Sequence, residues 1–127
     1  MKFLTQMPLV AILLALGLTT AMPSKSAEKG DVQEGEASYY AKVLDGQKTA
    51  SGDTYDASAF TAAHRSLSFG TRVRVTYLKT GKSVDVVIND RGPAVESRII
   101  DLSRAAAEKI GLAEDGSGKV KLEILTN

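Results

Sequence analysis

The sequence predicts a mainly β domain, a closed six-stranded barrel with one short helix. Two observations support this prediction. Short stretches of alternating apolar and polar residues follow one another from residue 37 to residue 125, and one segment alone has clear helical spacing. Six short strands in so small a domain need protection for their outer edges, and closure into a barrel removes those edges.

The clearest element is a hairpin. Residues 71–77 and 83–89 each alternate between apolar and polar side chains, and turn-forming residues at 79–82 separate them. This pattern predicts two half-buried antiparallel strands. Four further strand candidates complete the set: residues 37–43, 60–63, 98–100 and 118–125.

The helix is expected over residues 104–110. Ser103 is a suitable N-cap, and Gly111 can adopt the left-handed conformation that ends many helices. A helix of about two turns is unstable alone. Its alanines and Ile110 should therefore pack against the sheet.

Residues 1–27 are predicted to be a signal peptide. Lys2 supplies a positive start, and the apolar run over residues 8–18 is too short to cross a bilayer of about 30 Å as a helix. Cleavage is expected between Met22 and Glu28, which predicts a periplasmic or secreted protein. An uncleaved membrane anchor is the alternative. Because the chain has no Cys, no lipid anchor is expected.

The mature chain is expected to hold one domain. Residues 28–36 are polar without an apolar period and predict a tether, and residues 37–125 form the barrel domain. Sixteen basic against fifteen acidic residues give a net charge of +1, so nucleic acid is not an expected partner. With no Cys and a single His, thiolate zinc sites and disulfide frameworks are excluded. A monomer is expected.

Polar residues gather in segments predicted to be loops. Residues 48–56 carry Asp53 and Asp56, and each aspartate alone is typical of a turn that bonds its own backbone. His64 follows a strand candidate beside Arg65, where a hydrogen-bonded structural histidine is commoner than a catalyst.

Two further polar segments flank the second half of the predicted barrel. The turn over residues 89–93 is rich in donors and acceptors, and its plain interpretation is an Asx turn before a glycine. Asp101 lies between apolar residues just before the helix, where it can simply complement the helix N-terminus.

Taken together, these segments resemble the rare lipoprotein A (RlpA) family. The resemblance covers about residues 35–125, and five motifs in order are more specific than any one of them. The motifs are Thr-Ala-small-Gly-acidic-x-Tyr-Asp (49–56), Thr-Ala-Ala-His-Arg (61–65), Phe-Gly-Thr-x-Val-x-Val (69–75), Asn-Asp-Arg-Gly-Pro (89–93) and Arg-Ile-Ile-Asp-Leu-Ser (98–103).

The resemblance implies a double-psi β-barrel and lytic transglycosylase activity on peptidoglycan. Such enzymes cleave the β-1,4 bond between N-acetylmuramic acid and N-acetylglucosamine, with a preference for glycan strands that lack stem peptides. The C6 hydroxyl of the sugar replaces water and leaves a 1,6-anhydro end, so one acid/base group can serve both proton transfers. No metal or organic cofactor is implied.

The resemblance also implies four catalytic candidates. Asp90 or Asp101 is expected to be the proton donor, because apolar neighbours can desolvate its carboxyl. His64 is expected to orient the substrate or tune that acid. Asp53 stands where many relatives have Glu, which shortens its reach by one methylene.

Substrate contacts are expected from Tyr55, Asp56, Arg65 and Arg91. Arg91 is expected either to bind the lactyl carboxylate of muramic acid or to form an ion pair with a nearby aspartate. The alternative function is a non-catalytic wall-binding or wall-loosening module of the expansin kind. A third class is an exported inhibitor or toxin on the same barrel, although the disulfides common in such proteins are absent.

Overall fold

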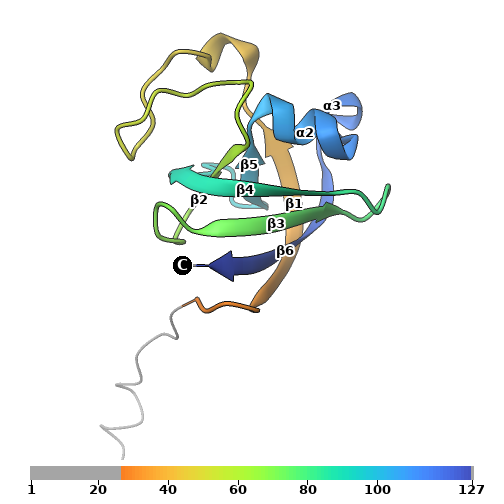
Figure 1. The fold of residues 1–127 in the computed structure, drawn as a ribbon. Helices are drawn as coiled ribbons and strands as arrows, with labels where there is room; N and C mark the ends of the chain where they lie inside the picture. Colours follow the sequence, from red (N-terminus) through yellow and green to blue (C-terminus); the bar gives the residue numbers. More distant parts are fainter. Residues whose placement is uncertain (1–26, 127) are drawn as a thin grey trace, which may run out of the picture.

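Six strands close into a barrel in the computed structural model, which describes residues 27–126 (Figure 1). Around the barrel the strand order is β1-β5-β2-β4-β3-β6. The β1/β5 and β2/β4 pairs are parallel and the other four pairs are antiparallel. The strands are β1 (Val32–Tyr39), β2 (Thr61–His64), β3 (Arg72–Tyr77), β4 (Ser83–Asp90), β5 (Arg98–Leu102) and β6 (Gly118–Thr126). The expected closed barrel and its β3/β4 hairpin are confirmed.

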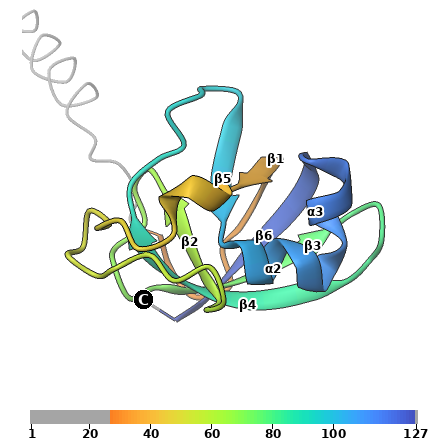
Figure 2. The same cartoon turned by 90° about the horizontal axis from the view of Figure 1, so that it is seen from above.

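The helical elements lie between strands. They are η1 (Lys42–Leu44), α2 (Arg104–Ile110) and α3 (Leu112–Asp115). The expected helix is α2: Ser103 accepts a hydrogen bond from the Ala106 amide, and Gly111 has φ of 84°. The short helix α3 was not expected. It follows α2 directly (Figure 2), and Gly111 in its left-handed conformation turns the chain between them. None of the described helices is both long enough and apolar enough to cross a membrane.

Strand β1 corrects the expected tether over residues 28–36. The strand begins at Val32, and residues 32–37 pair with β6 in antiparallel register. Its polar residues obscure the alternation of apolar and polar side chains that marks a half-buried strand. Gly35 packs closely against β5, since a Cβ there would lie 2.8 Å from the Ile99 side chain. The strand expected over 37–43 ends at Tyr39. The predicted signal peptide falls on residues outside the described part, apart from Ala27.

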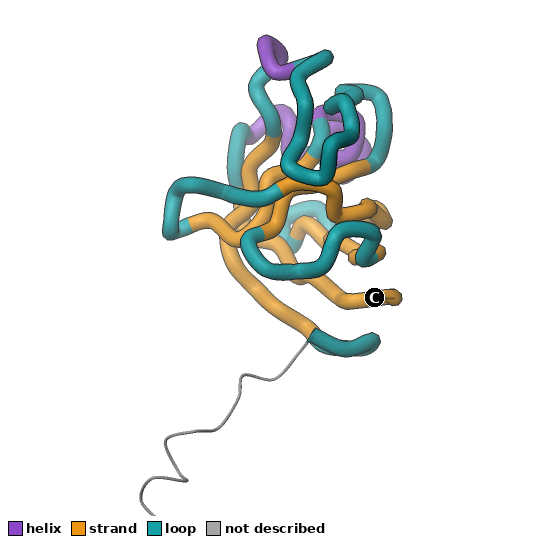
Figure 3. Tube along the Cα trace, turned by 90° about the vertical axis from the view of Figure 1, so that its left-hand side faces the viewer, coloured by secondary structure: helices purple, strands orange, loops and turns teal. Residues whose placement is uncertain are grey.

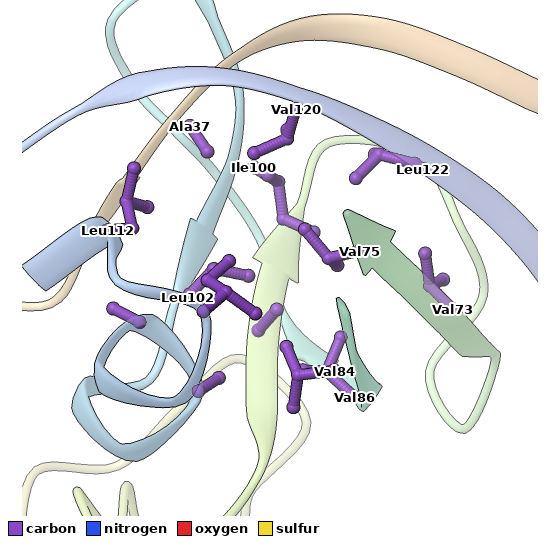
Figure 4. Packing of buried hydrophobic residues seen from close by; sticks show 14 of the residues in the cluster. Ala37, Val73, Val75, Val84, Val86, Ile100, Leu102, Leu112, Val120 and Leu122 are labelled. Atoms are coloured by element: carbon purple, nitrogen blue, oxygen red, sulfur yellow. The ribbon is translucent and has the colours of Figure 1, made fainter. Parts of the chain in front are cut away.

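The core fills the barrel interior (Figure 4). On β5, Ile100 and Leu102 are fully buried. Ile99, just before Ile100, and Asp101, between the two buried residues, are only half-buried. This alternation follows from the period of two along a strand. It turns Asp101 to the outer surface of the barrel while its neighbours hold the strand in the core.

Candidate active site

A groove of about 330 Å³ lies where β1 and β4 end. Most of its lining residues come from two segments, the one from β1 into η1 and the connection from β4 to β5; Figure 2 shows the course of both segments. Figure 3 shows the long connection from β1 to β2 standing out from the strands. The lining residues are Ser38, Tyr39, Tyr40, Ala41, Leu44, Ala63, Asp90, Arg91, Gly92, Pro93, Ala94, Arg98 and Asp101.

Strand register brings two carboxylates into this groove. Ala63 on β2 pairs with Asp90 of β4 on one side and with Asp101 of β5 on the other, and Asp101 pairs with Ser38 of β1. Cross-strand partners share a face, and neighbouring strands lie about 4.8 Å apart. The two aspartates therefore flank the small side chain of Ala63, two strand spacings from each other.

The Asp90 carboxyl is fixed by three donors. The amides of Ala50 and Arg91 donate to Oδ1 at 2.8 and 2.9 Å, and the Tyr40 hydroxyl donates to Oδ2. These donors come from three separate parts of the chain. The carboxyl is therefore held in one orientation by neutral groups, and no cationic side chain within residues 27–126 forms an ion pair with it.

Tyr40 is itself held in place. Its ring stacks on Tyr55 with centroids 4.3 Å apart and planes 17° apart. Burial, followed by the hydrogen bond to Asp90, raises the pKa of Tyr40 well above its usual range, so the phenol remains a donor. Tyr55 is buried, and its hydroxyl accepts a hydrogen bond from the Arg104 amide at the start of α2. Tyr55 supports Tyr40 from behind and does not line the groove.

Asp101 has a different environment from Asp90. Its Oδ1 accepts a hydrogen bond from the Ser38 hydroxyl at 2.7 Å and lies 3.9 Å from Arg98 Nε. Arg98 Nη1 also donates to Ser38 Oγ at 2.6 Å. Asp101 is thus the anionic member of a small network that contains a guanidinium.

His64 does not line the groove. It pairs with Ile100 in register and is 5% exposed. Nδ1 accepts hydrogen bonds from the amides of Ser66 and Leu67, and Nε2 lies 3.0 Å from Gln33 Oε1. Burial, with two nearby arginine charges, lowers the pKa of His64 to about 4. His64 is a neutral residue that shapes the turn after β2.

The depressed pKa of His64 predicts a loss of stability in acid. The folded protein keeps the imidazole neutral, whereas the unfolded chain takes up a proton below about pH 6.5. Stability is therefore full above pH 6.5 and falls as the pH drops toward 4. Urea titrations at pH 7.5 and pH 5 should show a decrease about 2 kcal/mol larger for the wild type than for His64→Gln. Equal decreases would contradict the assignment.

The Arg91 guanidinium is held by contacts within the protein. Its Nη1 donates to the carbonyls of His64 and Leu67 at 3.2 and 2.8 Å, and its guanidinium lies 4.1 Å from the Phe69 ring centroid. The expected ion pair with an aspartate is not formed within residues 27–126. Arg65 donates to the Val95 carbonyl at 2.7 Å and joins the end of β2 to the β4–β5 connection.

The comparison with known proteins assigns the family. A family model described as lytic transglycolase matches residues 32–122. The chain is 46% identical, over 95% of its length, to a Haemophilus influenzae protein named endolytic peptidoglycan transglycosylase RlpA. The chain belongs to the RlpA family. It spans 42% of the length of that relative.

Solved structures share the barrel. The Streptomyces papain inhibitor superposes with a TM-score of 0.64 at 23% identity, over 80% of this chain and 99% of that one. An expansin from Clavibacter michiganensis gives 0.60 at 21% identity, over 76% of this chain and 52% of that one. These likenesses show the fold alone, which for an RlpA chain is the double-psi β-barrel.

The remaining RlpA-motif aspartates lie outside the groove. Asp56 accepts hydrogen bonds from the amide and hydroxyl of Ser58 at 2.9 and 2.6 Å, which lower its pKa and make the local turn that its plain interpretation predicted. Asp53 is exposed, in a hairpin closed by a bridge between Lys48 and Thr54. This hairpin is fastened to the groove through the Ala50 amide and Asp90.

Among the groove residues that sequence reasoning gave no role are Ser38, Tyr40 and Arg98. Arg98 stood in the last of the five motifs but was given no role. Ser38 and Tyr40 lay in a strand candidate with no signal for chemistry, and only the pairing of β1 with β5 brings them to the groove. Within residues 27–126, no cluster of three or more His, Cys, Asp or Glu side chains could hold a metal ion.

Proposed function

We propose that this protein is a lytic transglycosylase that cleaves the β-1,4 bond between N-acetylmuramic acid and N-acetylglucosamine in peptidoglycan glycan strands. The observation that carries the proposal is Asp90, a carboxyl oriented by three neutral donors at the edge of a groove. The name of the Haemophilus influenzae relative supports the same reaction.

Asp90 is proposed as the single acid/base group. Two amides donate to Oδ1, so Oδ2, which accepts from Tyr40 alone, is the oxygen proposed to exchange a proton with the glycan. Asp90 gives this proton to the glycosidic oxygen as the bond from that oxygen to C1 of the muramic residue breaks. The C6 hydroxyl of the same residue then bonds to C1 and returns its proton to Asp90, which leaves a 1,6-anhydro ring.

Asp101, the other candidate for the acid, is assigned to positioning. Its carboxylate is paired with Arg98 and accepts from Ser38. The Asp101 carboxyl is thus already engaged with a cation, whereas no cationic side chain within residues 27–126 pairs with Asp90. The catalytic role expected of Asp53 and the substrate contact expected of Arg65 stay predictions, and so does the expectation of a periplasmic or secreted monomer after removal of residues 1–27.

The test is incubation of the purified protein with peptidoglycan freed of stem peptides, followed by mass spectrometry. We expect soluble fragments with 1,6-anhydro-muramic ends. Glycan that is retained on the protein but stays intact would favour the wall-binding alternative and overturn the enzymatic proposal.

A further inference from the structure

We propose that Arg98 is a specificity-determining residue that binds the free lactyl carboxylate of a muramic residue in the groove. This inference rests on the proposed function, because it takes the groove to bind peptidoglycan glycan. It assigns to Arg98 the contact with the lactyl carboxylate that was expected of Arg91.

The Arg98 guanidinium does not use all its hydrogen-bond donors within the described residues. Its side chain lines the groove and is 29% exposed. Nη1 donates to Ser38 Oγ, while Nε is buried without a hydrogen-bond partner among the described residues and faces Asp101 Oδ1 at 3.9 Å. Nη2 makes no hydrogen bond to any residue from 27 to 126. The donor left for a carboxylate of the glycan is therefore Nη2.

The other cation of the groove is not available in this way. Arg91 also lines the groove, but two carbonyls and the Phe69 ring hold its guanidinium. Asp101 and Ser38, in contrast, orient Arg98 without using all its donors. Among the described groove residues, Arg98 is therefore the cation with capacity for an anionic ligand.

The position of Arg98 suits a muramic residue. Asp90 and the Asp101–Arg98 pair flank Ala63, whose small side chain leaves room for a sugar ring between them. The proposal places the glycosidic oxygen at Asp90 and the lactyl group on C3 of the same muramic residue at Arg98.

The chemistry of the lactyl group makes this contact selective. In intact peptidoglycan the lactyl carbonyl is part of a neutral amide to the stem peptide. Hydrolysis of that amide frees a carboxylate, so Arg98 would be the physical cause of the preference for peptide-free strands that the family resemblance implies. Arg98 would then bind the carboxylate that a separate amide hydrolysis produces. When the peptide is present, the neutral amide offers the guanidinium no ionic partner.

The test uses the disaccharide N-acetylglucosaminyl-β-1,4-N-acetylmuramic acid, which lacks the scissile bond and so remains intact. NMR titration should show that the wild type binds this acid about tenfold more tightly than its lactyl amide. Arg98→Gln should bind the acid and the amide alike, near the affinity of the wild type for the amide. Arg72→Gln removes a charge outside the groove lining and should keep the wild-type preference.

Two results would overturn the proposal: a wild type that binds acid and amide equally, or an Arg98→Gln variant that keeps the preference. The formation of anhydro ends is scored separately. Cleavage without discrimination refutes the role of Arg98 and leaves the proposed function intact, whereas discrimination without cleavage supports Arg98 and refutes the enzymatic reaction.

Discussion

Asp90→Asn is expected to lower the rate of anhydro-end formation by about 10²–10⁴-fold. The amide keeps the shape of the side chain, and its oxygen can still accept hydrogen bonds from the Ala50 and Arg91 amides. What it lacks is the proton for the leaving oxygen. Initial rates on peptide-free glycan, with circular dichroism to check the fold, measure the effect.

Asp101→Asn is the matched comparison, because it makes the same chemical change across Ala63 from Asp90. We expect a loss of about tenfold, mostly in KM, since the variant weakens the network that orients Arg98. A folded Asp90→Asn variant that cuts at the wild-type rate, or an Asp101→Asn variant with the larger loss, would show that the acid is misassigned.

Ile100→Ala is expected to lower the free energy of unfolding by about 2–5 kcal/mol. Ile100 is fully buried in the barrel core. Its truncation removes apolar contacts and leaves a cavity that β5 cannot close, because its neighbours in the sheet hold it on both sides. Urea unfolding at pH 7.5 measures the change.

Ile99→Ala provides the control, with the same truncation one residue earlier on the same strand. Ile99 faces outward and is half-buried against the hydrophobic core. Ile99→Ala should therefore lower the free energy of unfolding by less than half as much as Ile100→Ala. Similar losses for the two variants would contradict the alternation on β5 that also turns Asp101 toward the groove.

Elements with local signals were predictable from the sequence. The β3/β4 hairpin has period-two patterning and a turn, and α2 has both caps encoded in adjacent residues. Strand β1 was misplaced because its polar residues and Gly35 obscure any period. Its position depends on pairing with β5 and β6, which are distant in the sequence.

The candidate site shows the same division. Motif resemblance placed Asp90 and Asp101 among the important residues, and both line the groove. It could not separate their roles, because the partners that distinguish them, Tyr40 and Arg98, reach them through side-chain geometry. The role expected of His64 stays a prediction, and nothing local to it in the sequence indicates that both of its ring nitrogens have partners.

In the proposed reaction the sugar's own hydroxyl, not water, attacks the anomeric carbon. Digestion of peptide-free glycan in ¹⁸O-labelled water, followed by mass spectrometry of the products, distinguishes these two nucleophiles. We predict new muramic ends in the 1,6-anhydro form with no ¹⁸O. Reducing ends that carry ¹⁸O would show hydrolysis instead, and intact strands would show that the protein does not cleave glycan.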